Sequence, residues 1–95
     1  MSHDFYAYHV GKEDNEVAHI SIGYKSPVVQ DLYAALGVAH LNGGCSGVGE
    51  DVVFSKAELE AALSKVPDDF EHSREVAFLR ACIASRLDEV AISFC

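Results

Sequence analysis

A glycine-rich stretch carries the residue types that come closest to a nucleophilic site. Asn42–Gly49 contains four of the seven glycines of this 95-residue chain, and Cys45 lies among them. An exposed thiol near backbone donors and an imidazole, such as that of His40, can lose its proton and attack a substrate. Glu50 and Asp51 follow, and no Lys or Arg lies within ten positions of Cys45, so the local charge opposes a thiolate. A small enzyme or ligand-binding domain centred on Cys45 and His40 is therefore the alternative hypothesis.

The same stretch does not predict a nucleotide site. A phosphate-binding loop ends in Lys followed by Ser or Thr, which is missing here, and Glu50 and Asp51 would repel a phosphate. Because glycines supply no side chain for a core, the stretch is either a mobile connection or a backbone shaped to meet a partner. We expect it to adapt to a partner through Gly43, Gly44, Cys45, Gly47 and Gly49.

The histidines and cysteines do not reach a metal-ligand pattern. We expect His9 and His19 to come close together on one sheet face, but a structural zinc site needs four ligands. No Cys-x-x-Cys or His-x-x-x-His spacing supplies the others. The alternating acids and central glycine of a calcium-binding EF-hand loop are also missing. We predict neither a metal nor a cofactor.

Negative charge is the strongest compositional signal. The chain has 15 acidic and 7 basic side chains, a formal net charge of −8. Such a field repels nucleic acid and anionic lipid and attracts basic protein surfaces. The acids before the third predicted helix also have a local explanation, because negative side chains favour a helix N-terminus. The residues that we expect to bind a partner are Glu13, Asp14, Glu16, Glu50, Asp51, Asp68 and Asp69.

Two segments rich in aromatic and β-branched residues predict a β-hairpin. Phe5–Val10 and Val17–Tyr24 flank a polar segment. An even pairing register would centre the turn near Asp14 and place His9 and His19 on the polar face. The residues then expected on the apolar face are Tyr6, Tyr8, Val10, Ala18, Ile20 and Ile22.

Three helices follow, each marked by local signals. Ser26 is typical of a helix start and Gly37 of a helix end. Ser55 and Glu58 have the spacing of a capping box, which predicts the start of the second helix. The third helix follows the acidic link 68–71. Its predicted inward-facing residues are Val76, Leu79, Ile83 and Leu87.

This order of elements predicts an α+β fold in a single domain, residues 1–95. We expect a small three-stranded, mainly antiparallel sheet, made of the N-terminal hairpin and the strand Val90–Cys95, with about three helices packed on one face. Val52–Phe54 is a candidate short strand. The two open sheet edges could pair with another chain, so a structural subunit or homodimer is a further alternative.

The cysteine count and the N-terminal sequence favour a cytoplasmic protein without membrane contact. Cys45, Cys82 and Cys95 are too few and too scattered for a disulfide framework. The first residues form neither a basic region nor an apolar stretch, and no segment is long and apolar enough to span a bilayer.

In size, acidity and lack of catalytic motifs the chain resembles the small inhibitors and immunity proteins encoded by phages and mobile elements. The resemblance rests on composition and implies a binding protein that is not an enzyme. We therefore predict an inhibitor-type protein that engages a basic protein surface, including that of a nucleic-acid-binding protein, through acidic loops and tyrosines. We do not expect it to bind nucleic acid directly.

Overall fold

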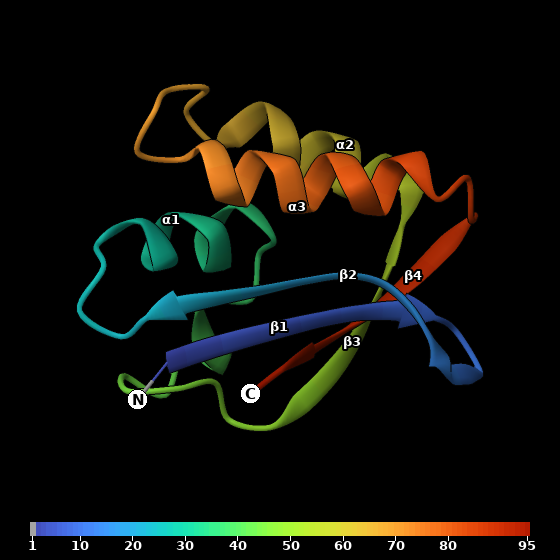
Figure 1. The fold of residues 1–95 in the computed structure, drawn as a ribbon, viewed down its shortest axis with the longest axis horizontal. Helices are drawn as coiled ribbons and strands as arrows, with labels where there is room; N and C mark the ends of the chain where they lie inside the picture. The colour runs from blue at the N-terminus through green and yellow to red at the C-terminus, as the bar shows by residue number, and fades with distance from the viewer. Residues whose placement is uncertain (1) are drawn as a thin grey trace.

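Four strands and three helices form two layers in the computed structural model, which describes residues 2–95 (Figure 1). The antiparallel sheet has the strand order β2-β1-β4-β3, and all three helices cover the same face of it. The strands are β1 (Ser2–His9), β2 (Lys12–Gly23), β3 (Glu50–Ser55) and β4 (Glu89–Phe94). The helices are α1 (Val28–Ala35), α2 (Lys56–Lys65) and α3 (Ser73–Ala84), with a short 3₁₀ turn η1 (Ala39–Leu41).

The predicted α+β class with helices on one face is confirmed, but the sheet has four strands where three were predicted. The additional strand is β3, which pairs with β4 from Glu50 opposite Phe94 to Ser55 opposite Glu89. It extends the candidate strand Val52–Phe54 in both directions. The sequence signal was short because the strand leads directly into α2, so that Ser55 belongs to the end of β3 and also caps the helix.

The predicted even register of the hairpin is wrong. Phe5 pairs with Ile20 and Ala7 pairs with Ala18, so the register is odd. Because successive side chains of a strand point to opposite faces, a shift of one residue exchanges the two faces of β1. Phe5 and Ala7 are buried beneath the helices, whereas Tyr6 lies on the opposite face and is 38% exposed.

The turn of the hairpin also differs from the predicted one. It consists of Val10 and Gly11, not of residues around Asp14, and Gly11 has a φ of +79°, in the left-handed region that favours glycine. The β1–β2 pairing shifts on both sides of Tyr8, as at a β-bulge, and the polar residues from Lys12 onward belong to the first half of β2.

Phe5 forms the centre of an aromatic cluster between the layers. Its ring centroid lies 4.9 Å from that of Tyr33, 4.9 Å from that of Phe94 and 6.2 Å from that of Phe78, each with edge-to-face geometry. A fully buried Phe contributes roughly 1.5–3 kcal/mol relative to an exposed one. Phe has no polar atom that needs water or a partner, which favours Phe5 over Tyr6 for this position.

The capping box and the left-handed Gly37 are confirmed, whereas Ser26 does not cap the first helix: the cap position is Pro27, without a side-chain hydrogen bond. Ser55 Oγ accepts a hydrogen bond from the Glu58 N–H at 3.1 Å, and Glu58 Oε1 accepts one from the Ser55 N–H at 2.9 Å, which completes the capping box. Gly37 has a φ of +72° and follows the end of α1. This helix begins at Val28, with Pro27 at the cap position.

The glycine-rich stretch is hydrogen-bonded along the end of β4. The Gly47 N–H donates to the Cys95 carbonyl at 2.9 Å, and the Gly49 N–H donates to the Phe94 carbonyl at 2.8 Å. An ideal Cβ on Gly47 would lie 2.5 Å from the carbonyl carbon and oxygen of Phe94. This close backbone approach explains why the chain has glycine at position 47.

His3 connects the glycine-rich stretch to the core through two hydrogen bonds. Its buried ring contacts the Gly44 carbonyl through Nε2 and the Tyr33 hydroxyl through Nδ1, each at 2.9 Å. A carbonyl can only accept, so Nε2 donates to Gly44, and Nδ1 shares the second hydrogen bond with the Tyr33 hydroxyl. Burial raises the pKa of Tyr33 to about 12, so this hydroxyl stays protonated.

His72 joins α1, the α2–α3 connection and α3. Its ring is buried, with Nε2 2.8 Å from a carboxylate oxygen of Asp31 and Nδ1 2.7 Å from one of Asp69. Carboxylates accept from both nitrogens, so the imidazole is doubly protonated and cationic. The hydrogen bonds to Asp31 and then to Asp69 raise the pKa of His72 to about 9.

We predict that Gly47→Ala destabilises the protein by roughly 1–3 kcal/mol, because the new methyl group would contact the backbone of Phe94. Gly23→Ala is the matched control: a Cβ at Gly23 meets nothing within 4 Å, and we expect a change of about 0.5 kcal/mol or less. Urea unfolding of both variants measures the difference. Equal midpoints for the two variants would contradict the close approach at Gly47.

We predict that the contribution of His72 to stability is lost at alkaline pH. The pKa of this group is higher in the folded than in the unfolded state, so its stabilisation is complete below about pH 6.5 and disappears as the pH rises through about 9. Thermal unfolding of wild type and His72→Gln from pH 6 to pH 10 measures this. The wild type should unfold at the higher temperature near pH 6, with the difference shrinking toward pH 10; a constant difference would contradict a charged His72.

Candidate functional site

The face of the sheet that the helices leave uncovered carries a row of polar and aromatic side chains, which we call the open face. Across the four strands, Tyr6 lies beside His19 on one side and Ser93 on the other, and Asp51 follows beside Ser93. In the next row Tyr8 is opposite Ala91, which is only 3% exposed. The open-face residues are Asp4, Tyr6, Tyr8, Glu16, His19, Asp51, Val53 and Ser93.

A hollow of about 240 Å³ lies in the middle of the open face. It is smaller than the roughly 300–1,000 Å³ of typical small-molecule sites. Its size suits a single protruding side chain of a partner better than a whole cofactor. The lining residues are Tyr6, Ala7, Tyr8, Glu13, Glu16, Asp51 and Ser93.

Two side-chain contacts shape this hollow. The Tyr8 hydroxyl donates to Asp51 Oδ2 at 2.5 Å, and this hydrogen bond to the carboxylate raises the pKa of Tyr8 to about 12. The rings of Tyr6 and His19 are stacked with centroids 4.3 Å apart and planes inclined by 3°. The first contact holds a carboxylate in place, and the second holds an aromatic ring upright on the sheet.

Charge is distributed unequally between the two layers. The four strands carry one basic residue, Lys12, whereas the other six lie in the helices and connections together with eight of the acids. Most of the net negative charge of the chain, −6 of −8, therefore belongs to the strands. The acids of the strands are Asp4, Glu13, Asp14, Glu16, Glu50, Asp51 and Glu89.

The structure brings three of the seven sequence-predicted partner-binding residues together. Glu13, Glu16 and Asp51 line the same hollow, although they come from opposite ends of the sheet order. Asp14 is exposed in the same hairpin half of β2. Glu50 is exposed but pairs with Phe94, so it belongs to the helix-covered side of β3.

Asp68 and Asp69 lie away from this hollow, in the connection between α2 and α3. Asp69 accepts from His72, and Asp68 lies 3.8 Å from the guanidinium of Arg80. Both acids therefore have partners within the protein. Glu75 is only 2% exposed, and its Oε2 has no hydrogen-bond partner within residues 2–95, so it is withdrawn from the surface.

The Cys45 and His40 alternative gains no geometric support. Both side chains are exposed, and no hydrogen bond between them occurs in the described part of the chain. His9 and His19 were predicted to lie close together, but His9 lines a hollow with Ala84 and Leu87 at the end of α3, whereas His19 stacks on Tyr6. Within residues 2–95, no three His, Cys, Asp or Glu side chains come together as a metal site.

Tyr6 and Tyr8 were predicted on the apolar face of the hairpin, although tyrosines were expected to contribute to partner binding, and their position on the open face was not predicted. One signal could have identified them: β1 alternates Phe5 and Ala7 with two tyrosines, and a tyrosine hydroxyl needs a hydrogen-bond partner or water. The contact between Tyr8 and Asp51 had no sequence signal, since it requires β4 to lie between β1 and β3.

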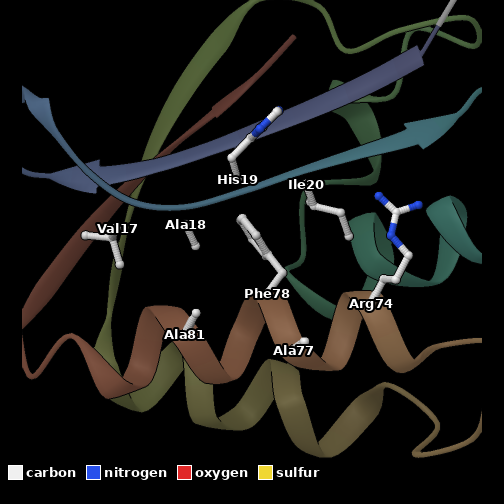
Figure 2. A pocket seen from close by; sticks show the side chains of 8 residues that line it. All are labelled: Val17, Ala18, His19, Ile20, Arg74, Ala77, Phe78 and Ala81. Atoms are coloured by element: carbon white, nitrogen blue, oxygen red, sulfur yellow. The ribbon is translucent and has the colours of Figure 1, made fainter.

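A second hollow of about 370 Å³ runs between β2 and α3 and has a different character (Figure 2). Ala18, Ala77, Phe78 and Ala81 give it a mainly apolar lining, and His19 points away from it, to the other side of the strands. The Arg74 guanidinium donates to the Ser21 carbonyl at 2.7 Å. Arg74 is thus hydrogen-bonded to an outward-facing carbonyl of the edge strand β2, which an added strand would need as a hydrogen-bond acceptor.

Comparisons with family models, with curated proteins and with solved structures gave no match. Among residues 2–95, no helix has the length and apolar character needed to cross a membrane.

We predict that Asp51→Asn lowers the pKa of Tyr8 from about 12 toward the ordinary tyrosine value of 10.0, because the substitution removes the carboxylate that stabilises the protonated phenol. Titration of the tyrosine Cζ signals by NMR measures this. Glu60→Gln in α2 is the control and should leave Tyr8 unchanged. An unchanged pKa of Tyr8 in Asp51→Asn would show that the contact is not maintained in solution.

Proposed function

We propose that this protein is a non-enzymatic binding module that holds a basic segment of a partner protein against the open face of its sheet. The observation that carries the proposal is the hollow in which two tyrosines are flanked by the carboxylates of Glu13, Glu16 and Asp51. Tyrosine provides apolar contact area together with a hydrogen-bonding tip, which is why it is enriched at protein interfaces.

The charge of the strands supports a basic partner. Four of the seven acids in the strands, Asp4, Glu13, Glu16 and Asp51, lie on the open face or line its hollow, which gives a negative field on the side that the helices leave open. Such a field accelerates the encounter with a positively charged protein and opposes the approach of nucleic acid or anionic lipid. The six Lys and Arg residues elsewhere lie in the helices and connections, so they do not offset it locally.

The chemistry of the hollow supports the same conclusion. Its side-chain polar groups are carboxylates and hydroxyls, which all accept hydrogen bonds. They therefore complement the N–H groups of Lys or Arg. A partner held in this way would have part of its basic surface covered by the module. An anion that normally binds this basic surface would then be excluded, so the module would inhibit anion binding by the partner.

The test uses a fluorescently labelled nona-lysine peptide as a purely electrostatic probe of the surface. The double variant Glu16→Gln/Asp51→Asn removes two carboxylates from the hollow, and the matched control Glu60→Gln/Glu71→Gln removes two exposed carboxylates from α2 and the α2–α3 connection. Both variants have the same net charge, so any difference between them reports position.

We predict that the open-face double variant binds the peptide about tenfold more weakly than wild type, mainly through a lower association rate, whereas the control changes affinity by about twofold or less. Affinity of the wild type should fall as salt rises from about 50 mM to about 200 mM. Fluorescence anisotropy and stopped-flow mixing measure both quantities. Equal effects of the two double variants, or binding that salt does not weaken, would refute the proposal.

A further inference from the structure

We propose that the hollow on the open face is a receptor for an arginine side chain and discriminates against lysine. This inference rests on the proposed function and specifies which basic side chain the site takes. Arg and Lys carry the same charge, so the preference must come from the shape and the hydrogen-bonding groups of the site.

One face of the Tyr6 ring is turned toward the hollow. The row across the sheet runs His19, Tyr6, Ser93 and Asp51, so His19 covers the Tyr6 ring from the β2 side. Tyr6 also lines the hollow, whereas His19 does not. The second face of the ring is therefore turned toward Ser93 and Asp51. A planar guanidinium can stack on this face, and a lysine ammonium has no flat surface to do so.

Several separate hydrogen-bond acceptors surround that ring. Tyr8 holds Asp51 through Oδ2, which leaves Oδ1 available for a ligand. Glu13 and Glu16 line the same hollow from β2. A guanidinium has five N–H donors spread around the edge of one plane, so several separated acceptors can bind it at once. An ammonium is a compact point charge, and a single carboxylate satisfies much of its need.

The size of the hollow also suits a single side chain. A hollow of about 240 Å³ leaves room for one long side chain rather than for a folded segment. The apolar parts of Tyr6 and Tyr8 can pack against the methylene stem of the arginine, while the head reaches the carboxylates. The occupant is accordingly one arginine that protrudes from a basic surface of the partner protein.

The experiment compares labelled nona-arginine and nona-lysine peptides, which have equal length and charge. We expect wild type to bind nona-arginine about tenfold more tightly than nona-lysine. Tyr6→Phe keeps the flat ring and should keep the preference. Tyr6→Leu removes the ring and should bring nona-arginine down to the affinity of nona-lysine, with little change for nona-lysine itself. Tyr6 is exposed, and thermal unfolding of each variant verifies the fold.

The outcomes separate this inference from the proposed function. Equal affinities of wild type for the two peptides, or a preference that survives in Tyr6→Leu, would overturn the arginine receptor and leave the charge-driven function intact. An equal decrease in affinity for both peptides in Tyr6→Leu would also overturn the arginine receptor, because the Tyr6 ring would then not distinguish arginine from lysine. If Glu16→Gln/Asp51→Asn binds nona-lysine as well as wild type does, the proposed function itself fails.

Discussion

The side to which each residue of β1 points is the constraint on which the rest of the structure depends. This strand is central in the order β2-β1-β4-β3, and alternate residues of a strand must face opposite ways. The pairing of Phe5 with Ile20 and of Ala7 with Ala18 puts Phe5 between the layers and Tyr6 and Tyr8 on the open face. The opposite choice would bury two hydroxyls and expose Phe5, with a loss of the aromatic cluster. The core and the candidate site are thus two consequences of one register.

The parts of the fold that could be predicted from the sequence are those whose signal is complete within a few residues. The capping box of Ser55 and Glu58 and the left-handed Gly37 need no information from the rest of the chain. The register of the hairpin could not be derived in this way, because β1 has apolar or aromatic residues at both odd and even positions and only the tertiary packing decides between them. Only part of the hollow could be predicted from the sequence. Its acids could be identified by their charge, but the contact between Tyr8 and Asp51 depends on the position of β4 between their strands.

The glycine-rich stretch shows how a feature that suggests a flexible loop can have a structural explanation. Gly47 lies so close to the carbonyl of Phe94 that a side chain would not fit, and His3 holds the carbonyl of Gly44 from within the core. These contacts connect the stretch to both central strands, β1 and β4. The strand β3 begins immediately after the stretch, so its pairing at the sheet edge, and with it the position of Asp51, depends on the same contacts. Glycine here provides close backbone approach, and the loop acts as a support of the open face.

The unequal charge of the two layers supports the proposed binding surface, because charges that served only solubility would be spread evenly over the protein. In the helices and connections, three of the eight acids have cationic neighbours: Asp31 and Asp69 bind the His72 imidazolium, and Asp68 lies beside Arg80. The strands contain seven acids and one Lys; Asp4 lies 3.5 Å from His19 Nε2, and the Asp51 carboxylate accepts a hydrogen bond from the neutral phenol of Tyr8. Self-repulsion among carboxylates lowers the stability of the free protein, and a bound cation relieves it. Under the proposed function, a guanidinium placed between the carboxylates of Glu13, Glu16 and Asp51 would supply a countercharge on the open face.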